Sequence, residues 1–212
     1  MTRGRFITFE GGEGAGKTTQ VRRLAERLAV RGVETVVTRE PGGSPGAEQL
    51  RDLLVRGSVD RWSPTAETLI LYAAREDHLQ RLIRPALARG AWVLCDRFAD
   101  STRAYQGAAG GADVRLIADL ERAVIGDTQP DLTVLLDVPV ELGLGRAHSR
   151  GGAETRFEDK GAAFHMRLRD AYLAIAAAEP ARCVVIDSSR TPDEVAAQLW
   201  SAVSARLALG AA

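Results

Sequence analysis

The sequence predicts an α/β fold, with a mostly parallel sheet covered by helices on both faces. Short apolar runs alternate with segments of helical apolar spacing along the chain, and this alternation is typical of such sheets. A glycine-rich stretch of the phosphate-binding type joins the first apolar run to the first helical segment. Because the chain has 212 residues and 45% hydrophobic content, we expect a single domain spanning residues 1–212.

The N-terminal part supplies two strands and one helix. Residues 5–10 form an apolar run that predicts a strand, and the apolar stripe of 16–31 predicts a helix. A second strand is expected at 33–38. Residues 39–46 are too rich in glycine and proline for a regular element. They therefore predict a shaped loop at the carboxyl end of a strand, the edge where α/β proteins bind ligands.

The middle of the chain is mainly helical. Helical patterns cover 47–55 and 64–89, and a Ser-Pro pair suits the start of the second one. Residues 91–95 predict a short third strand that ends in an Asp-Arg pair, and 113–125 predicts a further helix.

The C-terminal part completes a sheet of five strands. Strands are expected at 132–136 and 182–187, and helices at 140–149, 161–178 and 192–209. The stretch around 146–160 includes a charged, glycine-containing segment without apolar periodicity. We expect it to form a short arginine-rich lid.

Residues 11–18 match the pattern G-x-x-x-x-G-K-[ST] between a strand and a helix. The glycines allow a tight turn whose N–H groups point inward, and the helix adds the positive end of its dipole. Lys17 would reach the β- and γ-phosphates of a nucleotide, and Thr18 would hold Mg²⁺. Lys160 is the only other lysine among 28 basic residues, so a lysine at this position strengthens the prediction of nucleotide phosphate binding.

Two acidic residues and an arginine stand near this predicted edge. Asp96, at the end of an apolar strand, is a candidate for holding Mg²⁺ directly or through water, although a carboxylate there also suits a turn. Arg97 offers a planar fork to a second phosphate, or else a salt bridge to a nearby acid. Glu13 lies inside the phosphate loop, where bound triphosphate would repel it. We expect Glu13 to point toward a hydroxyl group of a second substrate or toward its metal-bound water.

Three arginines lie in or just before the expected lid, namely Arg146, Arg150 and Arg156. A lid arginine brings movable positive charge to a phosphoryl group in transfer, and such arginines accelerate the reaction by several orders of magnitude. In an arginine-rich chain, each of them alone also fits a solvated surface position. The cluster is therefore a stronger catalytic candidate than any one member.

Composition limits the partners. Acidic and basic residues balance at 28 each, so no field of one sign suggests a nucleic-acid or membrane-surface partner. No apolar run reaches the roughly 18 residues of a membrane span, and no signal-peptide pattern opens the chain. We therefore expect a cytoplasmic protein. Cys95 and Cys183 lack metal-ligand spacing and read as small buried residues.

Several short motifs occur in order along essentially the full length. They are the phosphate loop at 11–18, Thr-Arg-Glu-Pro-Gly-Gly at 38–43, Tyr-Ala-Ala-Arg at 72–75, Asp-Arg at 96–97 with Ser-Thr-Arg-Ala-Tyr-Gln-Gly at 101–107, and Pro-Asp-Leu-Thr at 130–133 followed by Leu-Asp at 136–137. In this order they resemble the bacterial thymidylate kinase family. The resemblance implies a three-layer P-loop NTPase fold, usually a homodimer, that transfers the γ-phosphoryl group of ATP to dTMP with Mg²⁺.

The resemblance also implies roles for individual residues. Arg75 resembles the arginine that hydrogen-bonds the thymine edge, and Tyr105 the residue that closes the 2′ side of the sugar. Arg39 and Arg97 resemble those near the dTMP phosphate, and Glu13 the acid near the 3′-hydroxyl. With the motifs, the expected site residues are Gly11, Gly12, Glu13, Gly14, Ala15, Gly16, Lys17, Thr18, Thr19 and Arg146 for ATP; Glu13, Arg39, Leu71, Arg75, Arg97, Ser101, Thr102, Tyr105 and Gln106 for dTMP; Thr18 and Asp96 for Mg²⁺; and Lys17, Arg97, Arg150 and Arg156 for catalysis.

The chain differs from the family pattern at informative positions. Leu71 stands where the family usually has a phenylalanine that stacks on thymine, and leucine covers a ring without π stacking. Gly14 occupies the position where some members carry a catalytic arginine, so the arginine must come from the lid. His148 stands where close relatives often have another arginine, and we assign it no role.

Three other functions also fit a phosphate loop. A GTPase switch is disfavoured because the chain has no N-K-x-D pattern for recognising guanine. A kinase for another small acceptor, such as a different nucleotide or shikimate, is the stronger alternative among enzymes. A non-catalytic ATP-binding scaffold is the third, but it would need neither Glu13 nor the lid arginines.

Overall fold

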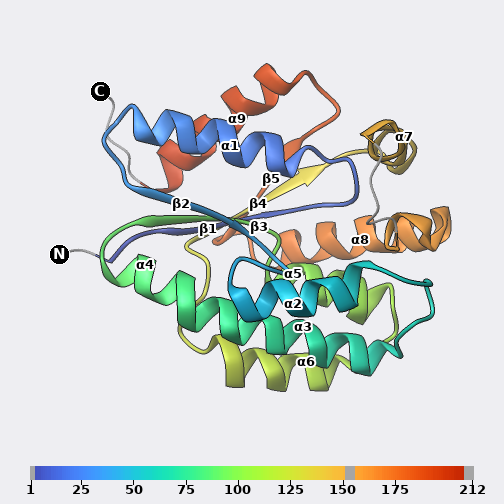
Figure 1. Ribbon diagram of the computed structural model, residues 1–212. Coiled ribbons are helices and arrows are strands. Elements are labelled where there is room, and N and C mark those ends of the chain that lie inside the picture. The colour runs from blue at the N-terminus through green and yellow to red at the C-terminus, as the bar shows by residue number, and fades with distance from the viewer. Residues whose placement is uncertain (1–2, 151–155, 208–212) are drawn as a thin grey trace.

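The structure is a computed structural model in which residues 3–150 and 156–207 are described. In this part of the chain, five strands form one sheet in which every pair is parallel (Figure 1). They are β1 (Phe6–Glu10), β2 (Thr35–Arg39), β3 (Trp92–Asp96), β4 (Leu132–Asp137) and β5 (Cys183–Asp187), in the spatial order β2-β3-β1-β4-β5. The predicted five-stranded parallel sheet is confirmed.

Helices cover both faces of the sheet (Figure 1). One face carries α1 (Lys17–Ala29) and α9 (Pro192–Arg206). The other carries α2 (Pro45–Val55), α3 (Pro64–His78), α4 (Arg84–Ala88), α5 (Ala99–Thr102), α6 (Val114–Leu120) and α8 (Ala162–Ala178), while α7 (Val140–Arg150) follows β4 at the carboxyl edge. The three-layer architecture predicted from the sequence is therefore confirmed.

The three central strands, β1, β3 and β4, are mostly apolar because both of their faces are buried. Ile7 and Phe9 of β1 pack in the core under α1 and α9, whereas Phe6, one residue before, packs in the core on the other face, edge-on to Phe98 with ring centroids 5.0 Å apart. The strands end at the carboxyl edge of the sheet in charged residues, among them Glu10, Arg39 and Asp96. Pairing of Asp96 with both Phe9 and Arg39 brings three strand ends together there.

The long helix expected at 64–89 is present but changes its winding. After α3 the chain continues as a π-helical segment, Leu79–Ile83, and then as α4. Likewise, α6 runs into the π-helical Glu121–Ile125, so the helix predicted at 113–125 is also present.

One helical region was not predicted from the sequence. Helix α5 continues into the π-helical segment Arg103–Ala108. Its buried positions include the polar Asp100, Thr102 and Gln106. Because polar residues are buried here, the apolar periodicity that marks ordinary helices is absent.

Only part of the expected lid is described. Residues 151–155 lie outside the described part of the chain, and Glu158–Lys160 forms a single 3₁₀ turn before α8. No helix among the described residues is both long and apolar enough to cross a membrane.

Candidate active site

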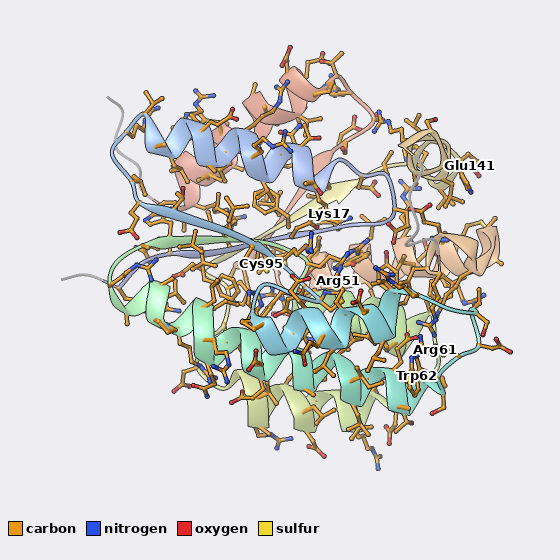
Figure 2. All side chains as sticks on the ribbon, viewed as in Figure 1. Lys17, Arg51, Arg61, Trp62, Cys95 and Glu141 are labelled. Atoms are coloured by element: carbon orange, nitrogen blue, oxygen red, sulfur yellow. The ribbon has the colours of Figure 1, made fainter. Side chains whose placement is uncertain are left out.

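An open cavity of about 1340 Å³ lies at the carboxyl edge of the sheet. The phosphate loop and the start of α1 form one side of it, and α2, α3 and the segment from β3 to Gln106 form the other. Figure 2 labels Lys17 on the first side and Arg51 of α2 on the second. Most of the expected site residues line this cavity: Glu13, Gly14, Ala15, Gly16, Lys17, Thr18, Thr19, Arg39, Leu71, Arg75, Asp96, Arg97, Ser101, Thr102, Tyr105 and Gln106.

The phosphate loop is folded around its own lysine. The Lys17 ammonium donates to the carbonyl oxygens of Gly11 and Gly12, each at 3.0 Å. The loop is also held from behind, because the Ser188 hydroxyl donates to the Ala15 carbonyl oxygen at 2.6 Å. Burial, reinforced by the positive charge of Arg97, lowers the pKa of Lys17 to about 8. An anion bound in the loop would favour the charged ammonium and so raise the pKa of Lys17 again.

Thr18 and Asp96 meet beside the loop. The Thr18 hydroxyl donates to the Asp96 carboxylate at 2.7 Å, although the two residues come from the start of α1 and the end of β3. A hydroxyl oxygen beside a carboxylate is a donor set that Mg²⁺ accepts, since this ion binds oxygen ligands and keeps several waters. The pair therefore fits the magnesium ion that ATP chemistry needs.

The Glu13 side chain bonds two residues that follow β3. Its carboxylate accepts from the Arg97 guanidinium at 3.0 Å and from the Tyr105 hydroxyl at 2.6 Å. Burial alone would raise the pKa of Glu13, but the charges of Arg97 and Lys17 and the Tyr105 hydrogen bond outweigh it and lower that pKa to about 2. Glu13 is thus a fixed anion at neutral pH, and Arg97 is oriented by it.

A buried ionic cluster surrounds Arg75. The Arg75 Nε donates to Glu40 at 2.7 Å, and Nη2 donates to the Thr102 hydroxyl at 3.0 Å. The third guanidinium nitrogen, Nη1, is buried and has no hydrogen-bond partner among the described residues. Because buried donors are rarely left unpaired in proteins, Nη1 marks a position where a ligand oxygen would fit.

The partners of Arg75 were not identified from the sequence. Burial would raise the pKa of Glu40, but Arg75 and the His78 ring outweigh it and lower that pKa. The His78 ring bonds Glu40 at 3.1 Å and the Thr38 hydroxyl at 2.7 Å. Glu40 lies in the motif at 38–43, but no local pattern indicates that its carboxylate meets a helix 35 residues later.

The other residues expected to bind dTMP differ in exposure and in the partners that they already have. Leu71 is buried in α3. Arg39 is half exposed and paired with Glu48 at 3.2 Å. Ser101 uses its hydroxyl to donate to Glu10 at 2.5 Å. Arg51, which sequence reasoning did not single out, lines the cavity and donates to the Pro41 carbonyl oxygen at 2.6 Å.

Arg146, just before the expected lid, bonds to a different loop. Arg146 donates to the carbonyl oxygens of Ser188 and Ser189, at 2.8 and 3.3 Å, in the loop after β5. The side chain of Arg150, expected to be catalytic, lies outside the described part of the chain. Both Arg146 and Arg150 belong to α7, which packs against the phosphate loop through Gly143.

Arg156 was expected to face the transferring phosphoryl group, and the structure places it elsewhere. Its guanidinium is buried between α2 and α3, where it donates to the carbonyl oxygens of Leu54, Ser58 and Val59 at 3.0, 2.9 and 3.1 Å. It also forms an ion pair with Glu67. Four acceptors thus hold this side chain away from the phosphate loop.

Comparison with known proteins agrees with the motifs. The family model described as "Thymidylate kinase" matches residues 9–199. The thymidylate kinase of Caulobacter vibrioides is 64% identical over 209 residues, covering 99% of this chain and 100% of that protein, and the one of Bradyrhizobium diazoefficiens is 58% identical, covering 97% and 91%. A crystal structure of thymidylate kinase from Ehrlichia chaffeensis superimposes with a TM-score of 0.78 at 35% identity, covering 95% of this chain and 99% of that one. The chain therefore belongs to the thymidylate kinase family.

Proposed function

We propose a division of roles within the cavity for the reaction of this family. The protein is a dTMP kinase, which phosphorylates dTMP with ATP. The observation that carries the proposal is the buried Nη1 of Arg75, which has no partner among the described residues. Arg75 lines a cavity whose other side is a phosphate loop. One side of the cavity suits an anionic phosphate chain, and the other offers a hydrogen-bond donor to a base.

The phosphate loop holds ATP. Backbone N–H groups of the loop and the Lys17 ammonium bind the β- and γ-phosphates, and Thr19 extends this side of the cavity. Thr18 and Asp96 hold Mg²⁺, which neutralises charge on the phosphates when bound. The 2.7 Å hydrogen bond between these two side chains supports this role, because two oxygen ligands of one ion must lie close together.

The other side holds dTMP. Arg75 donates to a carbonyl of the base, and Leu71 covers the ring. Thr102 and Gln106 contact the base edge. These four residues line one wall of the cavity.

The sugar and phosphate of dTMP lie nearer the phosphate loop. Tyr105, held by Glu13, fills the space that a 2′-hydroxyl would need. Glu13 itself stands by the 3′-hydroxyl. Arg97 and the half-exposed Arg39 bind the monophosphate through charge-assisted hydrogen bonds. Arg97 is already oriented for this by its bonds to Glu13 and Gly11.

Steady-state kinetics with a panel of acceptors tests these roles. With ATP as donor, we expect kcat/KM to be highest for dTMP, lower for dUMP, which lacks the methyl contact, and lower still for dCMP. A buried donor left unpaired costs about 1 to 3 kcal/mol, so dCMP should be disfavoured about tenfold to a few hundredfold. Arg75→Ala should narrow the gap between dTMP and dCMP. Equal use of dCMP and dTMP by the unmodified protein would contradict the base-binding role of Arg75.

Assembly and location are further expectations. We infer a homodimer, the state that the family resemblance implies. Leu69 on α3 and Val114 on α6, with 47% and 68% of their surface exposed, are apolar positions available to such an interface. Sedimentation of the unmodified protein and of a Leu69→Asp variant tests this assembly. A cytoplasmic location is the expectation for an enzyme that uses ATP and a free nucleotide.

A further inference from the structure

Glu67 of α3 connects the lid to the wall of the dTMP site. It is only 3% exposed, and no sequence motif singles it out. One carboxylate oxygen accepts from the side-chain amide of Gln106 at 2.7 Å, and the other pairs with the guanidinium of Arg156. Lys160 lies 4.0 Å from the first oxygen. A single buried carboxylate therefore contacts a residue of the substrate cavity and two residues of the lid.

The charge of this carboxylate is balanced within the protein. The Arg156 guanidinium stays protonated at any physiological pH, and Lys160 adds a second positive group nearby. A buried carboxylate is stable as an anion when it is paired and hydrogen-bonded, as Glu67 is on both oxygens. An ionised carboxylate accepts hydrogen bonds but donates none.

This charge fixes the orientation of the Gln106 amide. A side-chain amide has an NH₂ donor and a carbonyl acceptor, and either could face a neutral partner. Facing an anion, only the NH₂ group forms a hydrogen bond, as the Nε2 to Glu67 contact shows. The carbonyl oxygen of Gln106 is then the group left for the cavity that this residue lines.

We propose that Glu67 is a positioning residue for base selection, acting through Gln106. With the amide oriented by Glu67, Gln106 presents an acceptor oxygen to the base edge. Thymine and uracil carry an N3–H donor, which pairs with this oxygen, whereas the N3 of cytosine is itself an acceptor and is repelled. Arg156 pairs with the other oxygen of the same carboxylate, so the lid supports the specificity of the base pocket. This inference rests on the proposed contact between Gln106 and the base.

The test is the ratio of kcat/KM values in a Glu67→Gln variant of the full chain, with ATP as donor. A neutral glutamine both donates and accepts, so the Gln106 amide loses its fixed orientation. The preference for dTMP over dCMP should fall about tenfold or more, with most of the change in KM. The preference for dTMP over dUMP should stay within about threefold, because thymine and uracil share the same edge. Ratios measured on one preparation do not depend on the fraction of active protein.

A matched control separates this effect from general damage. Glu121 forms a comparable partly buried pair with Arg103, with hydrogen bonds of 2.7 and 2.6 Å. Glu121→Gln should leave both acceptor ratios unchanged. In a Gln106→Met background, Glu67→Gln should have no further effect on the dTMP to dCMP ratio, because the two residues act as one unit.

The outcomes are distinct. If the unmodified protein prefers dTMP but Glu67→Gln keeps that preference, or loses selectivity for dUMP equally, the positioning role is wrong. If the unmodified protein does not distinguish dTMP from dCMP, the proposed base contacts fail and the inference fails with them. If Glu67→Gln does not fold, Glu67→Asp keeps the charge beside Arg156 and withdraws the carboxylate from Gln106. The dTMP to dCMP ratio should then fall as well, and an unchanged ratio would overturn the proposal.

Discussion

Gly14 of the phosphate loop lies directly against Gly143 of α7. A Cβ atom added at Gly14 would stand 1.9 Å from the Gly143 carbonyl oxygen, and the backbone there has a φ of +64°, which disfavours any L side chain. This contact gives a physical reason for the missing arginine in the loop. In this protein the approach of α7 leaves no room for a side chain at position 14, so an arginine must reach the phosphates from elsewhere.

Gly14→Ala should therefore destabilise the protein. Displacing the Gly143 backbone and holding alanine in the left-handed region together cost about 2 to 4 kcal/mol. The neighbouring Gly12 is the matched control, because a Cβ there meets nothing within 4 Å. Denaturant unfolding of the two variants measures the difference. A Gly14→Ala protein as stable as Gly12→Ala would show that α7 moves away from the loop at little cost.

The lid prediction concerns catalysis. Since Gly14 leaves the loop without an arginine, at least one of Arg150 and Arg156 should act in the transition state. Its replacement by alanine should lower kcat by roughly 10³ or more, with little change in the KM for dTMP. Because Arg156 is held by four acceptors between α2 and α3, we expect the larger loss for Arg150→Ala. If both variants keep kcat within about threefold, the lid does not supply the catalytic charge.

Arg156 should matter for stability whatever its catalytic role. Arg156→Ala leaves the buried Glu67 without its main partner and frees the carbonyl oxygens of Leu54, Ser58 and Val59. Breaking a buried pair by removing one partner costs about 3 to 5 kcal/mol. The exposed pair of Arg190 and Asp187 is a suitable control, and Arg190→Ala should cost less than about 1 kcal/mol. Equal unfolding midpoints for the two variants would contradict the structural role of Arg156.

Lys17→Ala should abolish phosphoryl transfer in a folded protein, as a kinase assay on the purified variant measures.

Lys17 should also link ATP binding to proton uptake. Burial and Arg97 lower the pKa of Lys17 to about 8 in the free protein, and bound phosphate raises it again because an anion favours the charged ammonium. Above that pKa the free lysine is largely neutral, so ATP binding near pH 8.5 takes up protons, about one per site at most.

Calorimetry in two buffers of different ionisation enthalpy measures this uptake. Lys17→Arg is the control, because an arginine stays protonated at this pH and binds no proton on adding ATP. Proton uptake that persists unchanged in Lys17→Arg would assign it to another group. Affinity for ATP should weaken as the pH rises through the pKa of the free lysine, since binding must then supply the proton.

The sequence by itself determined the fold class and the family. The phosphate loop is a local pattern, with every residue inside 11–18, and the alternation of strands and helices is a local periodicity. The sequence also predicted the edge of the sheet at which the site lies, because the carboxyl ends of parallel strands lie together. The sequence did not predict helix α5 and its π-helical continuation, because the buried face of this region is partly polar.

Only the tertiary structure decided which polar groups form hydrogen bonds and ion pairs with one another. Several hydrogen-bonded pairs are far apart in the sequence. Arg75 and Glu40 are separated by 35 residues, Gln106 and Glu67 by 39, and Arg156 and Leu54 by 102. Nothing local distinguishes a buried arginine from a solvated one, since the pairing depends on which helices the sheet brings together. From its position in the expected lid, Arg156 was therefore predicted to contact the phosphates. The packing of α2 against α3 assigned its guanidinium to Glu67, because a buried carboxylate requires a cation.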